Sequence, residues 1–383
     1  MDKPTVQDIF HRFYPAYLDQ YSPSPVQAKV AHNIMNCKTG AYGANVCVCE
    51  DCGFVQIHYN SCRNRCCPMC QAVPKEMWMD ARREDVLDAP YFHLVFTVPD
   101  ILNPVIYSNQ RLLYDALYHA ASSTISELTA DPKHLGAKVG YICILHTWGS
   151  EMNFHPHIHT ILLGGGLASN NQWKDNGENF FLPIRVISKM FRGKYLEELK
   201  RLWKEDKLVF HGTAEKFRNH YTFKELLDSC YGMDWIPHCK KTFNGAQTVI
   251  KYLGKYTHRI AVSNHRIVRM DDDTVTFLVK DYRNEGQWKE LTISGVEFVR
   301  RFLMHVPPRR FVRIRHYGLL CSRTKSQKLT LCRNLLGCKK YLSKLRDMEM
   351  PEILEHLYGI KVCVCKACGG HLGKPQMRMP LRC

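Results

Sequence analysis

From residue 5 to about residue 37, apolar and polar positions alternate with the spacing of an α-helix. Val6, Ile9 and Phe13 belong to a first apolar series, and a second series runs through residues 26–34. The stretch SPSP separates the two series, and proline interrupts helical structure because it lacks a backbone donor. The pattern therefore predicts two short helices at the N-terminus.

The middle of the chain alternates strand-like and helix-like segments. YFHLVFTV (91–98), KVGYICILHTWG (138–149) and HPHIHTILL (155–163) have the composition of strands, and RLLYDALYHAASSTISEL (111–128) has the spacing of an amphipathic helix. Adjacent strands joined by a short connection pair most easily in the antiparallel sense. The pattern predicts an α+β fold with a central antiparallel sheet and helices on one of its faces.

Weaker patterns in the rest of the chain indicate where its regions divide. From about 168 to 234 the polarity changes often, as in an embellishment of the sheet, and residues 246–258 have the spacing of a second long helix. Strand-like pieces (TVTFLVKDY, KELTISG), a helix near 296–304 and a basic tract follow. We divide the chain into N-terminal helices with a cysteine cluster (1–83), the central domain (84–265), a basic β/α region (266–345) and a cysteine-containing tail (346–383).

The charge of the chain indicates its partner. Lys and Arg number 53 against 36 Asp and Glu, which gives a formal net charge of +17. A charge of this size attracts polyanions, so nucleic acid is the predicted partner. An anionic membrane surface is the alternative, but we find no 18-residue apolar run, secretion signal or lipidation motif. We expect a cytosolic protein that binds no membrane.

Eight of the 18 cysteines lie between residues 37 and 70. In a reducing compartment such clusters bind metal more often than they form disulfides. Cys49-x2-Cys52 and Cys67-x2-Cys70 are 14 residues apart, a zinc-ribbon spacing, and predict one four-thiolate zinc site. The other four thiols predict a second zinc site, and two arginines between the ligands predict DNA contact. These residues are Cys37, Cys47, Cys62 and Cys66, with Arg63 and Arg65.

A smaller group of cysteines lies near the C-terminus. Cys365-x2-Cys368 is followed by two glycines, with Cys363 before the pair and Cys383 at the end of the chain. The irregular spacing of the second ligand pair makes this a weaker signal than the N-terminal cluster. We nevertheless predict a further zinc knuckle here.

Three histidines occupy alternate positions of one predicted strand. His155, His157 and His159 project from the same face, because successive side chains of a strand point to opposite faces. Imidazoles on one face predict a metal site, and the alternative is a set of ordinary polar-face histidines. The chain lacks the HxHxDH, HExxH and zinc-deaminase patterns of other metal enzymes.

Two tyrosines in the predicted second long helix supply candidate nucleophiles. Tyr252 and Tyr256 are four residues apart, which is about 400° of rotation and about 6 Å of rise, so both phenols lie on one face. Lys255 and Arg259 lie beside them and would bind phosphate oxygens. The alternative is an amphipathic helix with two half-buried tyrosines. A metal that orients a phosphodiester and a tyrosine that attacks it would together carry out DNA strand transfer.

Nearly the whole chain resembles the HUH (His-hydrophobic-His) rolling-circle insertion-sequence transposases of the two-tyrosine type, relatives of plasmid and phage replication initiators. The resemblance includes SCRNRCCPMCQ, PYFHLVFTVPDILNP, LHTWGSEMNFHPHIHTILLGGG, YLGKYTHRIAVSNHRI and RRFLMHVPPRRFVRIRHYGLL. It implies an HUH nuclease core with a zinc-ribbon-like N-terminal module. That family usually carries histidine at the position of Cys66 and often at that of Asn45, so Cys66 would be a replacement zinc ligand.

The resemblance also implies roles for single residues. His157 and His159 match the histidine pair that binds a divalent ion, magnesium or manganese. Tyr252 and Tyr256 match the nucleophiles, and Lys255 matches the lysine of a YxxK arrangement. The third ligand varies in that family, and we predict His155 ahead of a polar group such as Gln247.

The implied function is a transposase that nicks and rejoins single-stranded DNA at insertion-sequence ends through a 5′-phosphotyrosine intermediate. The alternatives are a relaxase or replication initiator with the same chemistry, and a zinc-ribbon DNA-binding regulator without enzymatic activity. No GxxxxGK[ST] loop indicates a built-in helicase. The basic tract interleaves arginines with aromatic residues, as single-strand-binding proteins do, and its predicted DNA contacts are Arg309, Arg310, Arg313 and Arg315.

Overall fold

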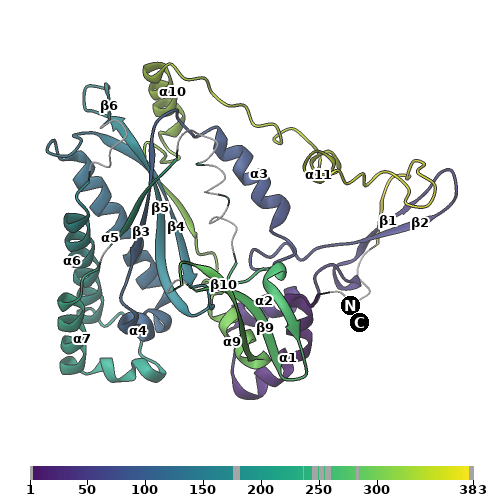
Figure 1. The fold of residues 1–383 in the computed structure, drawn as a ribbon, viewed down its shortest axis with the longest axis horizontal. Helices are drawn as coiled ribbons and strands as arrows, with labels where there is room; N and C mark the ends of the chain where they lie inside the picture. The colour runs from purple at the N-terminus through teal and green to yellow at the C-terminus, as the bar shows by residue number, and fades with distance from the viewer. Residues whose placement is uncertain are drawn as a thin grey trace.

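A central antiparallel sheet organises the protein. The computed structural model describes residues 3–378 except 176–181, 236, 244–248, 250–253, 255–259 and 282–283. Five strands of the sheet follow the order β11-β4-β5-β3-β7, and β6 pairs with β5 (Figure 1). This arrangement confirms the predicted α+β class. The strands are β3 (Tyr91–Thr97), β4 (Lys138–Trp148), β5 (Phe154–Leu167), β6 (Trp173–Asp175), β7 (His238–Phe243) and β11 (Ile314–Gly318).

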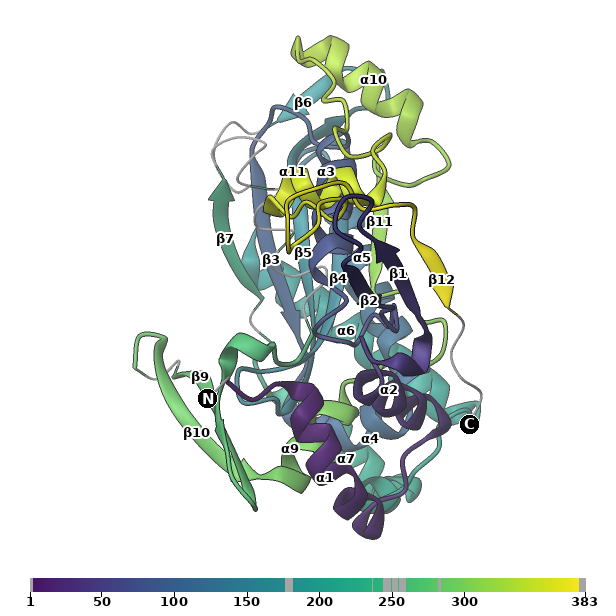
Figure 2. The same cartoon turned by 90° about the vertical axis from the view of Figure 1, so that its right-hand side faces the viewer.

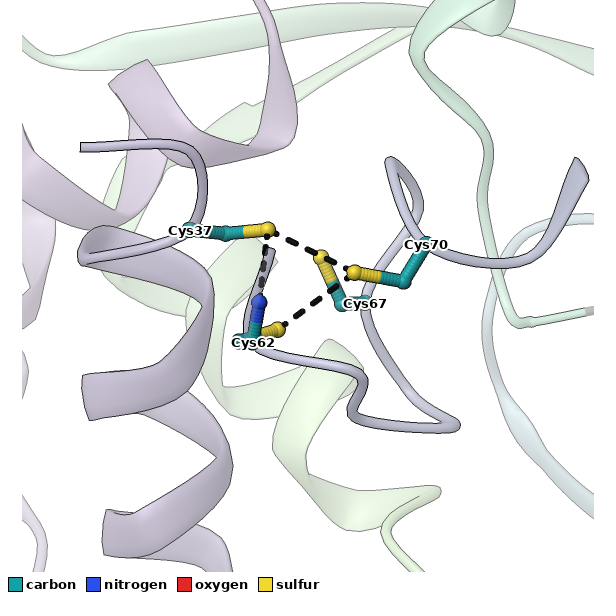
Figure 3. Close-up of side chains that lie close together, drawn as sticks. All are labelled: Cys37, Cys62, Cys67 and Cys70. Atoms are coloured by element: carbon teal, nitrogen blue, oxygen red, sulfur yellow. Dashed lines mark hydrogen bonds between the residues drawn. The ribbon is translucent and has the colours of Figure 1, made fainter. Parts of the chain in front are cut away.

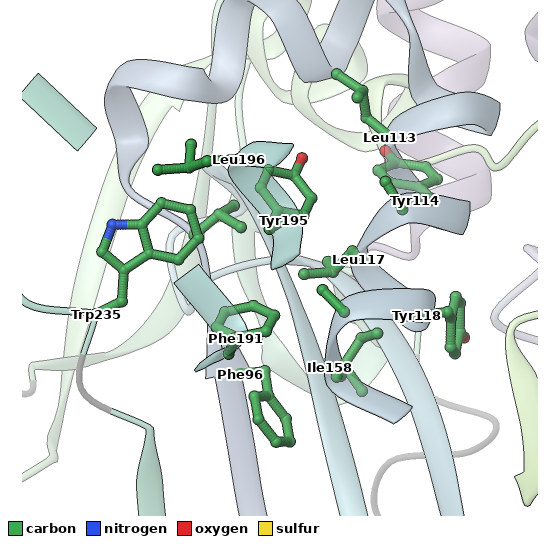
Figure 4. Packing of buried hydrophobic residues seen from close by; sticks show 14 of the residues in the cluster. Phe96, Leu113, Tyr114, Leu117, Tyr118, Ile158, Phe191, Tyr195, Leu196 and Trp235 are labelled. Atoms are coloured by element: carbon green, nitrogen blue, oxygen red, sulfur yellow. The ribbon is translucent and has the colours of Figure 1, made fainter. Parts of the chain in front are cut away.

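Helices cover one face of this sheet, as the sequence predicts. Alternate strand residues such as Phe96 and Ile158 are buried against them; Figure 4 shows Phe96 beside Phe191 of α6 and Ile158 near Leu117 of α5. The rings of Phe96 and Phe191 lie 5.0 Å apart. These elements are η2 (Asp100–Leu102), α4 (Asn103–Ser108), α5 (Gln110–Ala130), α6 (Ile184–Lys204), η3 (Gly212–Arg218) and α7 (His220–Gly232).

The opposite face of the sheet carries a smaller apolar cluster. Ile144 on β4 and Ile161 on β5 belong to it, with Trp78 and Met79 of α3 (Ala72–Arg83) and Leu329 of α10 (Lys325–Leu336). Because side chains alternate along a strand, this is also the face to which His157 and His159 point. One face of β5 therefore packs into the helix-covered core. The other face carries the smaller apolar cluster and the histidine pair.

The N-terminal helices pack against the region that follows residue 264. α1 (Val6–Gln20) and α2 (Pro25–Met35) begin at capping boxes, and Pro25 is the first residue of α2, where its missing N–H costs nothing. Phe10 and Phe302 meet edge-to-face at 5.2 Å. The partner elements are η4 (Asn264–Arg266), β8 (Ile267–Met270), β9 (Thr274–Asp281), β10 (Gln287–Ser294) and α9 (Gly295–Met304).

A second small sheet joins the two ends of the chain. β1 (Ala44–Val48) and β2 (Val55–Tyr59) form a hairpin after η1 (Gly40–Tyr42), and β12 (Gln376–Arg378) pairs with β1. The chain reaches this sheet from α10 through α11 (Met350–Tyr358), and both views show the last segment returning to the hairpin (Figures 1 and 2). Across the described residues, no helix has the length and apolar character needed to span a bilayer.

Candidate metal centres and catalytic site

Three buried histidines converge at the end of the central hairpin. His157 and His159 lie on β5, and His146 on β4 is directly opposite His157 in the antiparallel register. One ring nitrogen from each lies within 4.8 Å of the other two. The Nε2 atoms of His157 and His159 are 3.0 Å apart. Two nitrogens bound at about 2.1 Å and at a right angle on one ion would also be about 3.0 Å apart.

His155, the predicted third ligand, does not join this group. Its Nδ1 lies 3.3 Å from Oδ1 of Asp100, and its side chain is 37% exposed. The physical reason is the distance along the strand. His155 and His159 are about 13 Å apart in an extended backbone, too far for both to reach one ion. The cross-strand neighbour is much closer, at about 5 Å between Cβ atoms. A turn at residues 149–153 with Trp148 opposite Phe154 would have predicted Pro156 opposite His146, and an irregularity in the pairing between His146 and Trp148 brings His157 there instead.

The outer ring nitrogens of the histidine pair have hydrogen-bond partners. Nδ1 of His157 donates to the carbonyl of His155 at 2.7 Å, which leaves Nε2 as an acceptor. Nδ1 of His159 lies 2.9 Å from Nε2 of His93 on β3. Burial, with His238 and His157 nearby, lowers the pKa of His93 to about 3, so this imidazole stays neutral. Partners of this kind orient metal-ligating imidazoles.

The chemistry of the donor set fits a divalent first-row ion. His146, His157 and His159 are each less than 9% exposed, and within the described ranges no carboxylate belongs to the group. Magnesium prefers oxygen ligands, whereas the first-row transition ions accept imidazole with an affinity that rises from manganese towards copper. The group can therefore hold a metal beside the sheet, with the remaining coordination positions left for substrate oxygens.

Four cysteines form a first thiol group at the base of the N-terminal hairpin, and Figure 3 shows their sulfur atoms pointing toward one another. Cys37 follows α2, Cys62 follows β2, and Cys67 and Cys70 lie in the next turn. Sγ of Cys70 is 3.4 Å from Sγ of Cys37 and 3.6 Å from Sγ of Cys62. The hydrogen bond with Cys62 lowers the pKa of Cys70. This is the closed four-thiolate arrangement of a structural zinc site.

The structure corrects the predicted pairing of Cys49 and Cys52 with Cys67 and Cys70. Cys37 and Cys62 flank the base of the hairpin, where the amide of Lys38 donates to the carbonyl of Asn60 at 3.1 Å. Cys49 and Cys52 lie at its tip, and five extended residues separate the two ends by about 17 Å. Spacing alone does not reveal this, because it ignores the length of the hairpin. Cys47 and Cys66 are buried but belong to neither thiol group.

A second thiol group combines the tip of the hairpin with the C-terminal segment. Its members are Cys49, Cys52, Cys365 and Cys368. The predicted C-terminal knuckle thus lacks Cys363, which is exposed and outside the group, and Cys383 lies outside the described residues. No feature of the local sequence pairs these two motifs, because they are 313 residues apart.

Comparisons with known proteins identify the family. A family model described as "Transposase zinc-binding domain" matches residues 9–98, and one described as "Putative transposase" matches residues 140–328. The chain is 40% identical to "Putative transposase y4qJ" of Sinorhizobium fredii, over 95% of this chain and 93% of that protein. It is 30% identical to the transposase of insertion sequence element IS801 from Pseudomonas savastanoi pv. phaseolicola, over 79% of this chain and 72% of that protein. The chain belongs to the IS801/IS91 family of insertion-sequence transposases.

The family assignment confirms the predicted rolling-circle transposase and disfavours the initiator and regulator alternatives. It also confirms a zinc-binding N-terminal domain, whose match ends before the C-terminal cysteines. Solved structures of conjugative relaxase TrwC with oriT DNA are only weakly similar. The metal-free form has 13% identity and a TM-score of 0.25, and the match covers 43% of the transposase and 71% of that chain.

The predicted nucleophiles lie outside the described residues of the transposase, as do Lys255, Arg259 and Gln247; the nucleophiles are Tyr252 and Tyr256. Two residues near them in the sequence, Val249 and Gly254, are described. Val249 is buried with Ile144 and Ile161, on the sheet face to which the histidine pair points. Gly254 lies so close to the Met79 sulfur of α3 that a Cβ would collide with it.

The predicted DNA-contacting arginines that the structure describes have three kinds of surroundings. Arg63, Arg309 and Arg310 have exposed side chains. Arg65 instead donates from Nη1 to the carbonyl of Phe311 at 2.6 Å, which ties the zinc-binding module to the basic tract. The first group is available to phosphates, whereas Arg65 also has a structural role.

The remaining two arginines pack against aromatic rings. Arg315 lies 4.0 Å above the ring of Tyr118 and forms an ion pair with Asp115. Arg313 lies over Trp148 at 5.8 Å, and burial lowers its pKa. Phe302 and Phe311, two of the aromatic residues interleaved with arginines in the basic tract, are buried in the apolar clusters. Base stacking by these two rings would require the cores to open.

Proposed function

We propose that the transposase cleaves single-stranded DNA at insertion-sequence ends, with a divalent ion held by His146, His157 and His159 and with Tyr252 and Tyr256 as nucleophiles. The observation that carries this proposal is the convergence of three buried imidazoles on one sheet face. The family assignment supplies the DNA substrate. Val249, three residues before the first tyrosine, packs on that same face.

The reaction conserves the phosphodiester bond. A bound divalent ion would polarise the scissile phosphate and orient it for attack. The hydroxyl oxygen of one tyrosine attacks phosphorus in line and loses its proton to solvent or a nearby base. The bond from phosphorus to the 3′ oxygen breaks, and that oxygen leaves as a 3′ hydroxyl after taking up a proton. The 5′ phosphate stays on the tyrosine as an ester, so rejoining needs no nucleotide cofactor.

The second tyrosine permits a second cleavage while the first ester persists. One residue would hold the element end, and the other would hold the second strand until each freed 3′ hydroxyl attacks the opposite ester. Lys255 and Arg259 supply positive charge for the phosphate and the departing oxygen. Arg63, Arg309 and Arg310 extend that charge along the strand by contacts to its backbone. We place this reaction at the bacterial nucleoid, where the DNA lies.

We infer that manganese supports cleavage better than magnesium. The sequence resemblance admits either ion. Three neutral imidazoles favour manganese, the softer of the two ions, and a carboxylate ligand would be needed to favour magnesium. The neutral partner His93 fits this assignment, since it adds no negative charge to the ligand set.

A matched pair of histidine variants tests the site. His146→Ala should reduce metal-dependent nicking of a single-stranded element-end oligonucleotide by at least 100-fold, as removal of a ligand does. His155→Ala should stay within about threefold of the wild type, because its ring faces Asp100 and not the ligand group. DNA binding should be similar in both variants. The reverse order of activities would show that His155 and not His146 completes the site.

A further inference from the structure

The tip of the N-terminal hairpin and the C-terminal segment contain matching knuckles. In the first, the amide of Gly53 donates to the carbonyl of Cys49 at 3.0 Å, and the amide of Cys49 donates to Phe54 at 2.9 Å. In the second, Gly369 donates to Cys365 at 3.0 Å, and Cys365 donates to Gly370 at 2.8 Å. Both follow the pattern Cys-x2-Cys-Gly.

The glycine of each knuckle has a left-handed backbone conformation. The φ angles are 70° at Gly53 and 78° at Gly369. Glycine adopts this region without the steric cost that a Cβ would impose. Two turns of the same shape, each ending in such a glycine, are what a zinc ribbon needs to bring four thiolates to one ion.

The four thiols face one another across the two knuckles. Sγ of Cys49 is 3.5 Å from Sγ of Cys368, and Sγ of Cys52 is 3.8 Å from Sγ of Cys365. A tetrahedral zinc with bonds of about 2.3 Å separates its sulfur ligands by about 3.8 Å. The amides of Ala367 and Gly370 donate to the sulfurs of Cys365 and Cys368 at 3.4 Å each. Such bonds stabilise a thiolate over a thiol.

We propose that a second structural zinc is shared between the two ends of the transposase and clasps the C-terminal segment to the N-terminal hairpin. The ion completes a ribbon in which β1 and β2 come from one end and β12 from the other. It is distinct from the zinc of the Cys37 group, and the sheet histidines take no part in it. Its ligands also differ from those predicted, in which each end of the chain has its own site.

The apolar contacts of this ribbon are too few to hold it together alone. Its buried cluster consists of Cys47, Cys49, Cys365 and Leu372, and three of the four are cysteines. Within the described residues, β12 pairs with β1 over three residues, and one isolated bridge joins Cys49 to Leu372. A module of this size depends on metal for its stability, because it buries little apolar surface. Loss of the ion should therefore release the C-terminal segment.

The clasp also fixes the far end of a segment that lies along α3. Tyr341 and Ser343 donate hydroxyl bonds to the carboxylate of Asp80, and the amide of Leu345 donates to the same group at 2.9 Å. Arg346 pairs with Glu84 at 2.6 Å. These contacts hold residues 341–346, and the zinc would hold the residues beyond α11. The zinc would thereby connect the C-terminal segment, which contacts α3 at residues 341–346, back to the hairpin that precedes α3.

Zinc counting tests the shared site in the full chain. Cys49→Ser/Cys52→Ser and Cys365→Ser/Cys368→Ser should each contain one zinc less than the wild type, and the quadruple variant should lose no more than either pair. Any zinc held by the histidines is present in every variant, so it does not affect the difference in zinc count between variants. Cys363→Ser is the matched control, since this exposed neighbour lies outside the group, and it should retain the wild-type count. A loss of two zinc ions in the quadruple variant would overturn the shared site, as would an unchanged count in either pair.

A cut chain tests the clasp with every cysteine intact. A site for a specific protease inserted after Gly359, where Ile360 is 51% exposed, separates the C-terminal knuckle from the body. The fragment should co-elute with the body in gel filtration and dissociate when a chelator removes one zinc. In the Cys49→Ser/Cys52→Ser background it should dissociate without chelator. A fragment that stays bound after that zinc is gone would overturn the proposal, as would one that leaves while the full zinc count remains. Both results are independent of nicking activity.

Discussion

The histidine site and the hairpin ribbon bring their ligands together by different means. His146 and His157 are neighbours in a sheet that is buried on both faces, so strand pairing and core packing hold them in place. The ribbon cysteines lie on turns around a very small apolar cluster. Burial organises the first site before metal arrives, whereas the second needs metal to form. Metal loss should therefore inactivate the sheet site but unfold the ribbon.

The largest expected effect is on catalysis. His157→Ala/His159→Ala should reduce nicking by about 1000-fold or more, equivalent to about 4 kcal/mol of transition-state stabilisation. The melting temperature should change little, because the sheet persists without metal. Gel-based nicking assays and thermal denaturation measure the two quantities, with His155→Ala as control. Collapse of the fold together with activity would contradict the idea of a preorganised site.

The next effect is on stability at the first thiol group. Cys67 is fully buried in the cluster that joins the N-terminal helices to α9, so Cys67→Ser should cost about 3 to 5 kcal/mol of unfolding free energy and release one zinc. Urea denaturation and metal analysis measure both. Cys66→Ser, at a buried cysteine outside the group, is the control and should retain the zinc. Loss of zinc from the control alone would place Cys66 among the ligands.

A smaller effect is expected from the partner of His159. His93→Ala should weaken metal binding about 10-fold to 100-fold, because the ring of His159 loses the contact that orients it. His93→Gln, which can restore a hydrogen bond, should recover part of that affinity. Titration of manganese by calorimetry measures the effect separately from turnover. Equal affinity in all three proteins would show that His93 does not orient the ligand.

The smallest effect is a dependence of stability on pH. Burial lowers the pKa of His305 to about 4; Nε2 of its neutral ring donates to the carbonyl of Met152, and Nδ1 accepts from the hydroxyl of Thr147. Its unfolded value is about 6.5, so the unfolded chain binds a proton first as the pH falls from about 6.5 to about 4. The free energy of unfolding should decrease by about 2 kcal/mol between pH 7.5 and pH 5.

Urea denaturation at pH 7.5 and pH 5 measures this change. His305→Gln lacks the titrating group but keeps polar atoms, so it should lose less stability on acidification than the wild type does. The zinc thiolates contribute equally to the loss of stability in both proteins, so the difference between the two losses reports His305 alone. An identical loss in both would show that His305 is already protonated in the folded state.

The sequence predicted what local patterns determine. Alternation along β5 placed His157 and His159 on one face, and the strand and helix pattern predicted the α+β sheet. The missed features depend on contacts between distant segments. His146 follows from the register of β4 with β5, and the partition of the cysteines follows from the length of the hairpin and the return of β12. The sequence likewise did not predict that α1 packs on α9. The patterns of residues 1–83 and 266–345 each indicate local elements, and neither indicates a contact with the other region.

The central claim is that this transposase forms a covalent bond between DNA and one of two tyrosines. A labelled single-stranded element-end oligonucleotide, incubated with protein and manganese, should give an adduct on a denaturing gel. Tyr252→Phe/Tyr256→Phe should give none, since Phe keeps the ring and removes the attacking oxygen. Mass spectrometry of the digested adduct locates the bond most directly. We expect a phosphotyrosine at Tyr252 or Tyr256, and an adduct on any other residue would rule out these two nucleophiles.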